Sequence, residues 1–194
     1  MKRAQAVRHL AEMAETATEC RQSRGAPMAW PLSSMWVTGE LLETSPTVEG
    51  GTVVLLLDLP PDELPWLAVH PTGEWVSDAL RLGKRPVLWC YRPAAWPAWN
   101  ARHRRVLRFW SEDDGVGGEV LDALRNGRSP EIAEPDDEER RAQLREERDL
   151  ARRHLRAVLD GFHDRSWRRA HHDPADHLWR AAQGLREIED AAEG

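Results

Sequence analysis

The chain has 194 residues, of which 41% are hydrophobic and 31% are charged, and this composition is typical of a well-solvated globular protein. The formal net charge of -6 at pH 7 argues against binding of nucleic acid by the whole surface. No apolar run reaches the length of a membrane-spanning helix, and the N-terminal residues lack the apolar core of a secretion signal.

The cysteines and the basic residues indicate where the protein works. Cys20 and Cys90 stand far apart without a Cys-x-x-Cys spacing, so the sequence offers neither a zinc ribbon nor a redox motif. Free thiols in a chain without a secretion signal favour a cytoplasmic protein. Lys2 and Lys84 are the only lysines, and this Arg bias, together with many Ala, Pro and Trp residues, indicates a bacterial source with a GC-rich genome.

The first third of the chain predicts one helix and two strands. Residues 3–20 place Val7, Leu10 and Ala14 on one side of a helix, with Arg3 mainly elsewhere. A strand is expected over residues 35–38. Residues 51–60 form the longest apolar run, without alternation, so we expect a central strand covered on both faces.

The middle of the chain alternates short helices and strands. Turn residues and apolar spacing predict short helices over 60–68, 74–82 and 117–126, strands over 87–91 and 106–110, and a Trp/Pro loop over 93–100.

The last third predicts two helices. Residues 128–136 form a linker with two prolines, followed by a long helix over 136–164 that carries an apolar stripe under a solvated, charged face. Leu159 lies in that stripe. A last helix over 174–192 carries Trp179 and Ile188 at core spacing.

These elements predict an α+β fold, in which a small mixed β-sheet is flanked by helices. Residues 1–127 would form the α+β domain, 128–136 the linker, and 137–194 a C-terminal helical hairpin packed on the domain.

Gly39, at the end of the first strand and about ten residues before the central strand, carries a family resemblance. This layout resembles the nucleotidyltransferase superfamily, in which a Gly-Ser pair opens a helix and the next strand begins with two metal-binding carboxylates. Here Gly39 is followed by Glu40, the carboxylate positions offer only Glu49, and Asp58 comes late in the strand. The resemblance therefore implies a catalytically degenerate member that binds a nucleotide or a partner through Gly39, Glu40, Glu49 and Asp58.

The histidines near the last helix form a second candidate site. His171, His172, Asp173 and His177 have the residue types and spacing to bind zinc or a similar ion. The alternative is that Asp173 caps the last helix.

A third candidate site combines aromatic and basic residues. Trp96, Trp99, Arg102 and Arg105 could hold a ligand or a partner, because guanidinium groups beside aromatic rings bind phosphates and stack on bases. The alternative is that the tryptophans pack in the interior and the arginines pair with the acidic helices. The acidic net charge makes the nucleic-acid interpretation the weaker one.

The sequence contains no P-loop, nucleophile elbow or Gly-x-Gly-x-x-Gly motif, and it therefore favours a binding protein over an enzyme. An active metal-dependent nucleotidyl-transfer enzyme using Glu49, Asp58 or the histidines is one alternative, with magnesium or zinc as its metal. A homodimer formed through the C-terminal helices is another. The sequence does not identify the small molecule or protein that would be bound.

Overall fold

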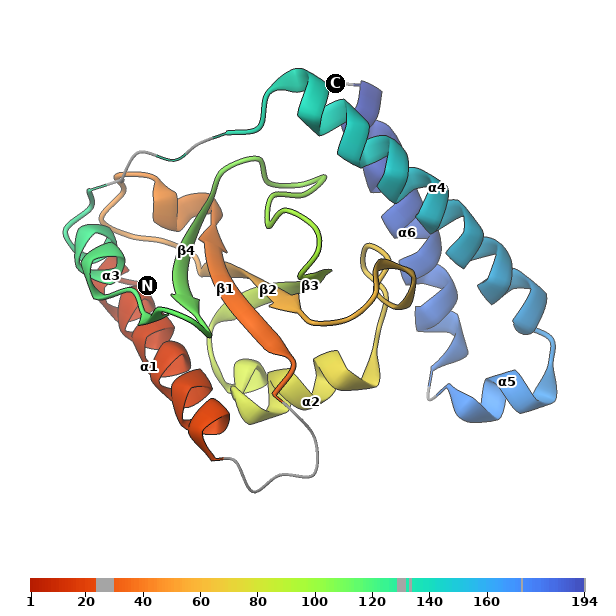
Figure 1. Ribbon diagram of the computed structural model, residues 1–194, viewed down its shortest axis with the longest axis horizontal. Coiled ribbons are helices and arrows are strands. Elements are labelled where there is room, and N and C mark those ends of the chain that lie inside the picture. Colours follow the sequence, from red (N-terminus) through yellow and green to blue (C-terminus); the bar gives the residue numbers. More distant parts are fainter. Residues whose placement is uncertain (24–29, 129–131, 133, 172, 194) are drawn as a thin grey trace.

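The computed structural model describes residues 1–23, 30–128, 132, 134–171 and 173–193. A five-stranded mixed sheet with the order β3-β2-β1-β4-β5 lies at its centre, with helices around it (Figure 1). The strands are β1 (Leu32–Thr38), β2 (Gly51–Leu57), β3 (Val87–Pro93), β4 (Val106–Ser111) and β5 (Gly115–Val116). β2 and β3 pair in parallel, and the other neighbours pair antiparallel. The predicted α+β class is confirmed.

The helices largely follow the predicted pattern. The α-helices are α1 (Arg3–Gln22), α2 (Pro71–Ala79), α3 (Gly118–Arg125), α4 (Asp137–Gly161), α5 (Arg165–Ala170) and α6 (Pro174–Glu193), and the 3-10 helices are η1 (Gly39–Leu42), η2 (Pro61–Glu63) and η3 (Leu82–Lys84). The predicted helix over 60–68 is only the single turn η2, because Pro65 has no N–H to continue it. α5 and β5 were not predicted, since such short elements leave little periodicity.

The face of the sheet that carries Val53, Leu55 and Leu57 is called the helical face. α1, α2 and α3 cover it, and their apolar side chains join those of the strands in one buried cluster. Leu10, Met13 and other residues of α1 are completely buried there. Helical spacing thus correctly located the buried stripe of α1, because burying that stripe supplies most of the helix's stability.

The opposite face of the sheet, called the loop face, carries Val54 and Leu56. The chain between β3 and β4 folds over it and packs Ala98 and Trp99 against these strand residues. Figure 1 shows this loop between the sheet and the C-terminal hairpin, which consists of α4 and the antiparallel α6. β2 is therefore buried on both faces, as predicted.

Arg3 corrects one detail of the sequence analysis. The side chain lies not on a solvated side of α1 but buried, where its guanidinium donates to the main-chain oxygens of Leu41 and Ser45. These contacts fix the end of η1 to the start of α1. A buried guanidinium is tolerated because its N–H groups find acceptors that the η1 turn leaves free.

The C-terminal hairpin also differs from the prediction in two side chains. Trp179 is 59% exposed and Leu159 is 51% exposed, although both had been placed in the buried stripe. α6 instead buries Ala181, Gly184 and Ile188. Small residues were not recognised as the packing face because their apolar surface contributes little to periodicity. Within the described residues, no helix is both long and apolar enough to cross a membrane.

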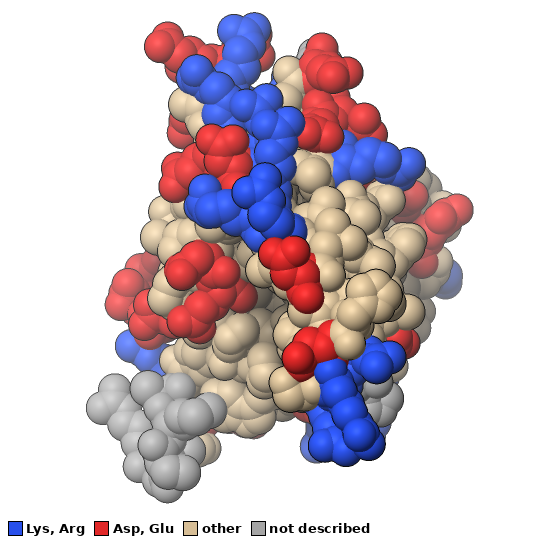
Figure 2. All heavy atoms as spheres, turned by 90° about the vertical axis from the view of Figure 1, so that its right-hand side faces the viewer, with Lys and Arg blue, Asp and Glu red and all other residues tan. Residues whose placement is uncertain are grey.

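Charged side chains of both signs cover the outer surface of the hairpin, as expected for a solvated face. Figure 2 shows Lys and Arg side chains in a run over its upper part, with Asp and Glu side chains on both sides. Asp136 begins α4 by accepting hydrogen bonds from the N–H groups of Glu138 and Glu139. Arg152 of α4 pairs with Glu189 of α6 at 2.7 Å.

Candidate functional site

The turn between β1 and β2 brings three of the predicted ligand-binding residues together. Gly39 has a left-handed backbone (φ +73°) that favours glycine at the start of η1. The Glu40 carboxylate accepts a hydrogen bond of 2.7 Å from the N–H of Glu49. This contact closes the turn, so one of the two carboxylates already has a structural partner.

Asp58 lies apart from this turn. Asp58 directly follows Leu57, the last residue of the seven-residue strand β2. Glu49 lies two residues before Gly51, the first residue of that strand. At about 3.3 Å per residue, the two carboxylates are separated by more than about 20 Å and cannot hold one metal ion. Neither β2 nor β3 contains an Asp or Glu residue that could replace them.

The histidines meet where α4, α5 and α6 come together. The His171 ring stacks on Trp167 at 4.0 Å between centroids, and His177 meets His171 edge-on at 4.6 Å. Burial and then the neighbouring His171 lower the pKa of His177, while burial and then His177 lower the pKa of His154. His154 and His177 therefore favour the neutral state.

This cluster has little of the character of a metal site. Asp173 caps α6, accepting hydrogen bonds from the N–H groups of Ala175 and Asp176, as the alternative interpretation predicted. Among the described residues, no group of three or more His, Cys, Asp or Glu side chains is placed to hold a metal ion. His172 lies outside the described residues, so its part in a zinc site stays a prediction.

The aromatic and basic candidates lie around the loop between β3 and β4. Trp96 and Trp99 are buried, and this placement leaves neither ring open to a ligand. Arg105 pairs with Glu43 at 3.2 Å and with Glu134 at 3.4 Å. The alternative given for these residues, interior packing and ion pairing, describes their contacts.

Arg102 attaches this loop to α6, and Trp66, from the segment between η2 and α2, contacts the same residue of α6. The Arg102 guanidinium donates two hydrogen bonds to the Glu187 carboxylate, at 2.6 and 2.8 Å, and the indole N–H of Trp66 donates to the same carboxylate at 2.8 Å. Burial acts to raise the pKa of Glu187, but these hydrogen bonds outweigh it and leave the pKa lowered. Gly184 lies so close to the main-chain oxygen of Trp66 that a Cβ atom at this position would clash with it.

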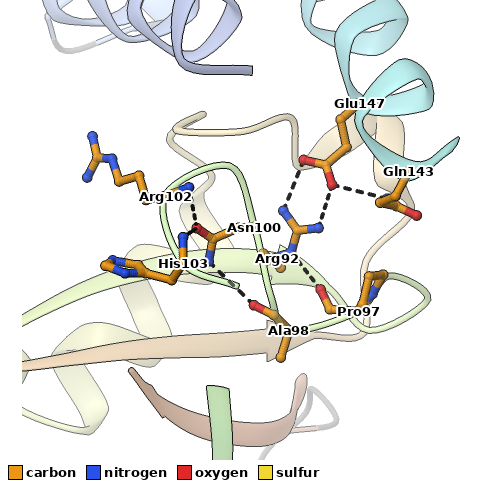
Figure 3. Close-up of polar contacts among 8 residues, drawn as sticks. All are labelled: Arg92, Pro97, Ala98, Asn100, Arg102, His103, Gln143 and Glu147. Carbon is orange, nitrogen blue, oxygen red and sulfur yellow. Dashed lines mark hydrogen bonds and ion pairs between the residues drawn. The ribbon is translucent and has the colours of Figure 1, made fainter. Parts of the chain in front are cut away.

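A second, buried ion pair joins the loop face to α4. Arg92 of β3 and Glu147 of α4 have side chains that are each 1% exposed, and they share hydrogen bonds of 2.6 and 3.1 Å (Figure 3). The Arg92 Nε donates to the main-chain oxygen of Pro97, and Gln143 donates to Glu147. All three guanidinium nitrogens of Arg92 are therefore engaged, as a buried charge requires.

Asn100 holds the loop in the shape that presents Arg102 to the hairpin. Figure 3 shows its side-chain oxygen accepting hydrogen bonds from the N–H groups of Arg102 and His103, while its amide donates to the main-chain oxygen of Ala98. These residues fix the C-terminal hairpin to the sheet. The residues that the sequence predicted as ligand contacts in this region, Trp96, Trp99, Arg102 and Arg105, make internal contacts in the structure. Their part in binding a ligand stays a prediction.

The free edge of β3 offers a different kind of site. Pro86 O bonds to Gly51 N and Ala94 N bonds to Leu57 O, so the even-numbered residues from 86 to 94 point their backbone groups toward β2. The backbone groups of Trp89 and Tyr91 therefore face away from the sheet. No described residue pairs with them.

A groove of about 410 Å³ runs beside this strand and is called the edge groove. It is lined by Leu67, Ala68, Val69, Glu74, Ser77, Leu88, Trp89, Cys90, Tyr91, Arg102 and Arg180. Leu88 is 72% exposed and Trp89 is 37% exposed, so large apolar side chains lie next to the unpaired backbone. Unpaired strand edges flanked by apolar side chains are surfaces on which another strand can add.

Comparison with known families assigns the whole chain to one family. A family model described as a domain of unknown function (DUF7711) matches residues 1–194. The chain belongs to this family. Comparisons with curated proteins and with solved structures give no match.

Cys90 does not supply the edge groove of this DUF7711 chain with a nucleophile. Burial raises the pKa of its thiol to about 12, so the thiol stays protonated at neutral pH. The groove is suited to binding and not to thiolate chemistry.

Neither the buried ion pair nor the edge groove was predicted from the sequence. Arg92 is the only charge in the run from Val87 to Pro93, and Glu147 lies at helical spacing between the core residues Leu144 and Ala151. A charge at a core position of each element was a usable signal for a buried pair. The edge groove had no such signal, because the order of strands within a sheet cannot be predicted from local sequence patterns.

Proposed function

We propose that this protein is a non-catalytic binding protein that takes an extended segment of a partner protein as an additional strand beside β3. The single observation that carries the proposal is the unpaired outer backbone of Trp89 and Tyr91 beside the apolar edge groove. Main-chain hydrogen bonds would supply affinity, and the side chains of the groove would supply specificity.

The environment of the edge supports a binding role over an accidental exposure. Proteins protect exposed edges with charged side chains, bulges or a covering element. β3 instead presents Leu88 and Trp89. Its only charge, Arg92, lies on the loop face and is buried against Glu147, so it does not protect the edge. Pro86 and Pro93 bound the open stretch, which limits pairing to a short segment.

The resemblance to nucleotidyltransferases stays part of the proposal. The order α1-β1-η1-β2, with Gly39 in a left-handed turn before η1, agrees with the layout that this resemblance implies. The missing carboxylates in β2 and β3 support a degenerate, non-catalytic member. A cytoplasmic location in a bacterium stays a prediction from the sequence.

Two substitutions at one position test strand addition. Short random peptides displayed on phage would be selected on the full chain, and binding of the selected peptides would be measured with the wild type, Trp89→Ala and Trp89→Pro. Both variants lose the indole, but only proline loses the outward N–H. We expect Trp89→Pro to bind about tenfold more weakly than Trp89→Ala, the factor for a hydrogen bond worth about 1.4 kcal/mol.

The control is the fold of the two variants, compared by circular dichroism and thermal unfolding, because the Trp89 N–H takes no part in the pairing with β2. Hydrogen exchange on the wild type gives a second readout: the amides of Trp89 and Tyr91 should become protected when peptide binds. Equal affinities of the two variants, with unprotected amides, would exclude strand addition.

A further inference from the structure

The charges on the two sides of the edge groove indicate which segments it selects. We propose that the groove binds segments in which a cationic side chain, facing α2, alternates with an apolar side chain, facing Leu88. This inference depends on the strand addition proposed above, and it names the chemical class of the partner.

The register of the sheet fixes which side chains meet. Trp89 and Tyr91 are paired with Val53 and Leu55 of the helical face, and Leu88 is paired with Thr52 on the loop face. Neighbouring residues in paired strands point to the same face. Residues of an added strand opposite Trp89 and Tyr91 would therefore point toward α2, and those opposite Leu88 toward the hairpin.

The α2 side of the groove is acidic and aromatic. Glu74 and Asp78 lie one helical turn apart on α2, are exposed, and have no ion-pair partner among the described residues. Burial is the main cause that raises the pKa of Tyr91, and the negative charges of Glu74 and Asp78 raise it further. The two carboxylates therefore lie near the groove. The exposed Trp89 ring offers a face of the kind that binds cations.

On the hairpin side, none of the described residues that line the groove is acidic. Its two cations are already paired, Arg102 with Glu187 and Arg180 with Asp176. Leu88 is the large apolar side chain that is exposed on this side. An apolar side chain would bury its surface against Leu88, whereas an acidic one would compete with carboxylates that already bind the arginines.

A second copy of this chain does not meet these requirements. If β3 paired with β3 of another molecule, the helical face would receive Val87, Trp89, Tyr91 and Pro93, none of which is cationic. The acidic α2 helices of the two copies would also lie on the same face of the joined sheet. A separate partner with basic residues in an extended segment fits better.

Three synthetic peptides would test the inference on the full chain. One alternates Lys and Val, the second alternates Glu and Val, and the third alternates Ser and Val. Affinities from fluorescence anisotropy at physiological salt should rank Lys over Ser over Glu, with roughly tenfold between the first and the last. The Lys peptide should also lose affinity as salt is raised.

Two matched charge reversals locate the cation. Glu74→Lys should weaken the Lys peptide and strengthen the Glu peptide, whereas Glu119→Lys should change neither. Both residues are exposed glutamates in the first turn of a helix, but Glu119 lies on α3 near the other edge of the sheet. A Lys preference that survives Glu74→Lys would overturn the inference.

The outcomes separate the two proposals. If all three peptides bind equally and Trp89→Pro weakens each of them, strand addition stands and the charge selection is wrong. If none of the three binds while phage-selected peptides do, the alternating pattern is wrong. If no peptide of either source binds, strand addition itself fails and the inference fails with it.

Discussion

The two faces of the sheet are covered in different ways. On the helical face, α1, α2 and α3 bury a continuous apolar cluster that includes Leu10 and Leu55. On the loop face, a loop rich in Trp and Pro lies next to the strands, and the hairpin is attached to it through Arg92–Glu147 and Arg102–Glu187. One face is held by a single continuous apolar cluster. The other combines smaller apolar clusters, one of which packs Leu144, Ala151 and Ile188 of the hairpin against Trp66, with two ion pairs.

This difference indicates which positions should tolerate substitution and which should not. Apolar contacts accept substitutions that conserve volume, since their free energy depends mainly on buried area. A buried ion pair adds little net stability, but removing one partner leaves an unpaired charge that is expensive to bury. Removing one partner of an ion pair should therefore have a large effect, and that effect should fall mainly on the hairpin.

The largest expected effect comes from breaking the buried pair. Glu147→Ala leaves the Arg92 guanidinium buried without its carboxylate and should lower the free energy of unfolding by about 3–5 kcal/mol. Urea unfolding measures this loss. The double variant Arg92→Met/Glu147→Leu should recover most of it, because no unpaired charge remains.

The matched control lies on the helical face. Leu55→Ala should cost a similar amount, about 2–5 kcal/mol, through a cavity in the apolar cluster. Truncation at a second core position cannot restore that loss. If the Arg92/Glu147 double variant is as unstable as Glu147→Ala alone, the distinction between the two faces is incorrect.

A smaller effect is expected at the second attachment. Arg102→Ala removes a half-exposed guanidinium and should cost about 1 kcal/mol at pH 7. The lowered pKa of Glu187 means that this stabilisation is present above the carboxyl's unfolded pKa of about 4.3 and disappears as pH falls through the folded pKa. Unfolding of the wild type and Arg102→Ala at pH 7 and in acid should therefore converge in acid. A constant difference between them would contradict this assignment.

The smallest effect should appear between pH 7 and 5, at the histidines of the hairpin. The lowered pKa values of His154 and His177 mean that the unfolded chain takes up protons first, so stability falls as pH drops below about 6.5. The protection factors of amides in α5 and its flanks, which are corrected for the intrinsic exchange rate at each pH, should fall over this range. His177→Gln should reduce this fall, while the protection factors in β1 and β2 should stay unchanged in both proteins.

The sequence by itself determined the elements whose signals are local. The unbroken apolar run of β2 and the helical spacing in α1 were both sufficient, because each reflects backbone geometry and burial within a few residues. The C-terminal helical hairpin and the α+β class followed from the order of these elements.

Only the tertiary structure decided how the elements meet. It brought Arg92 to Glu147 across 55 positions of sequence, turned Trp179 outward while Gly184 packed inward, and left β3 at the edge of the sheet. Strand order and interface charges depend on contacts between distant residues, and no local pattern records which residues those will be. For that reason the candidate binding edge is visible in the fold, whereas no sequence motif indicates it.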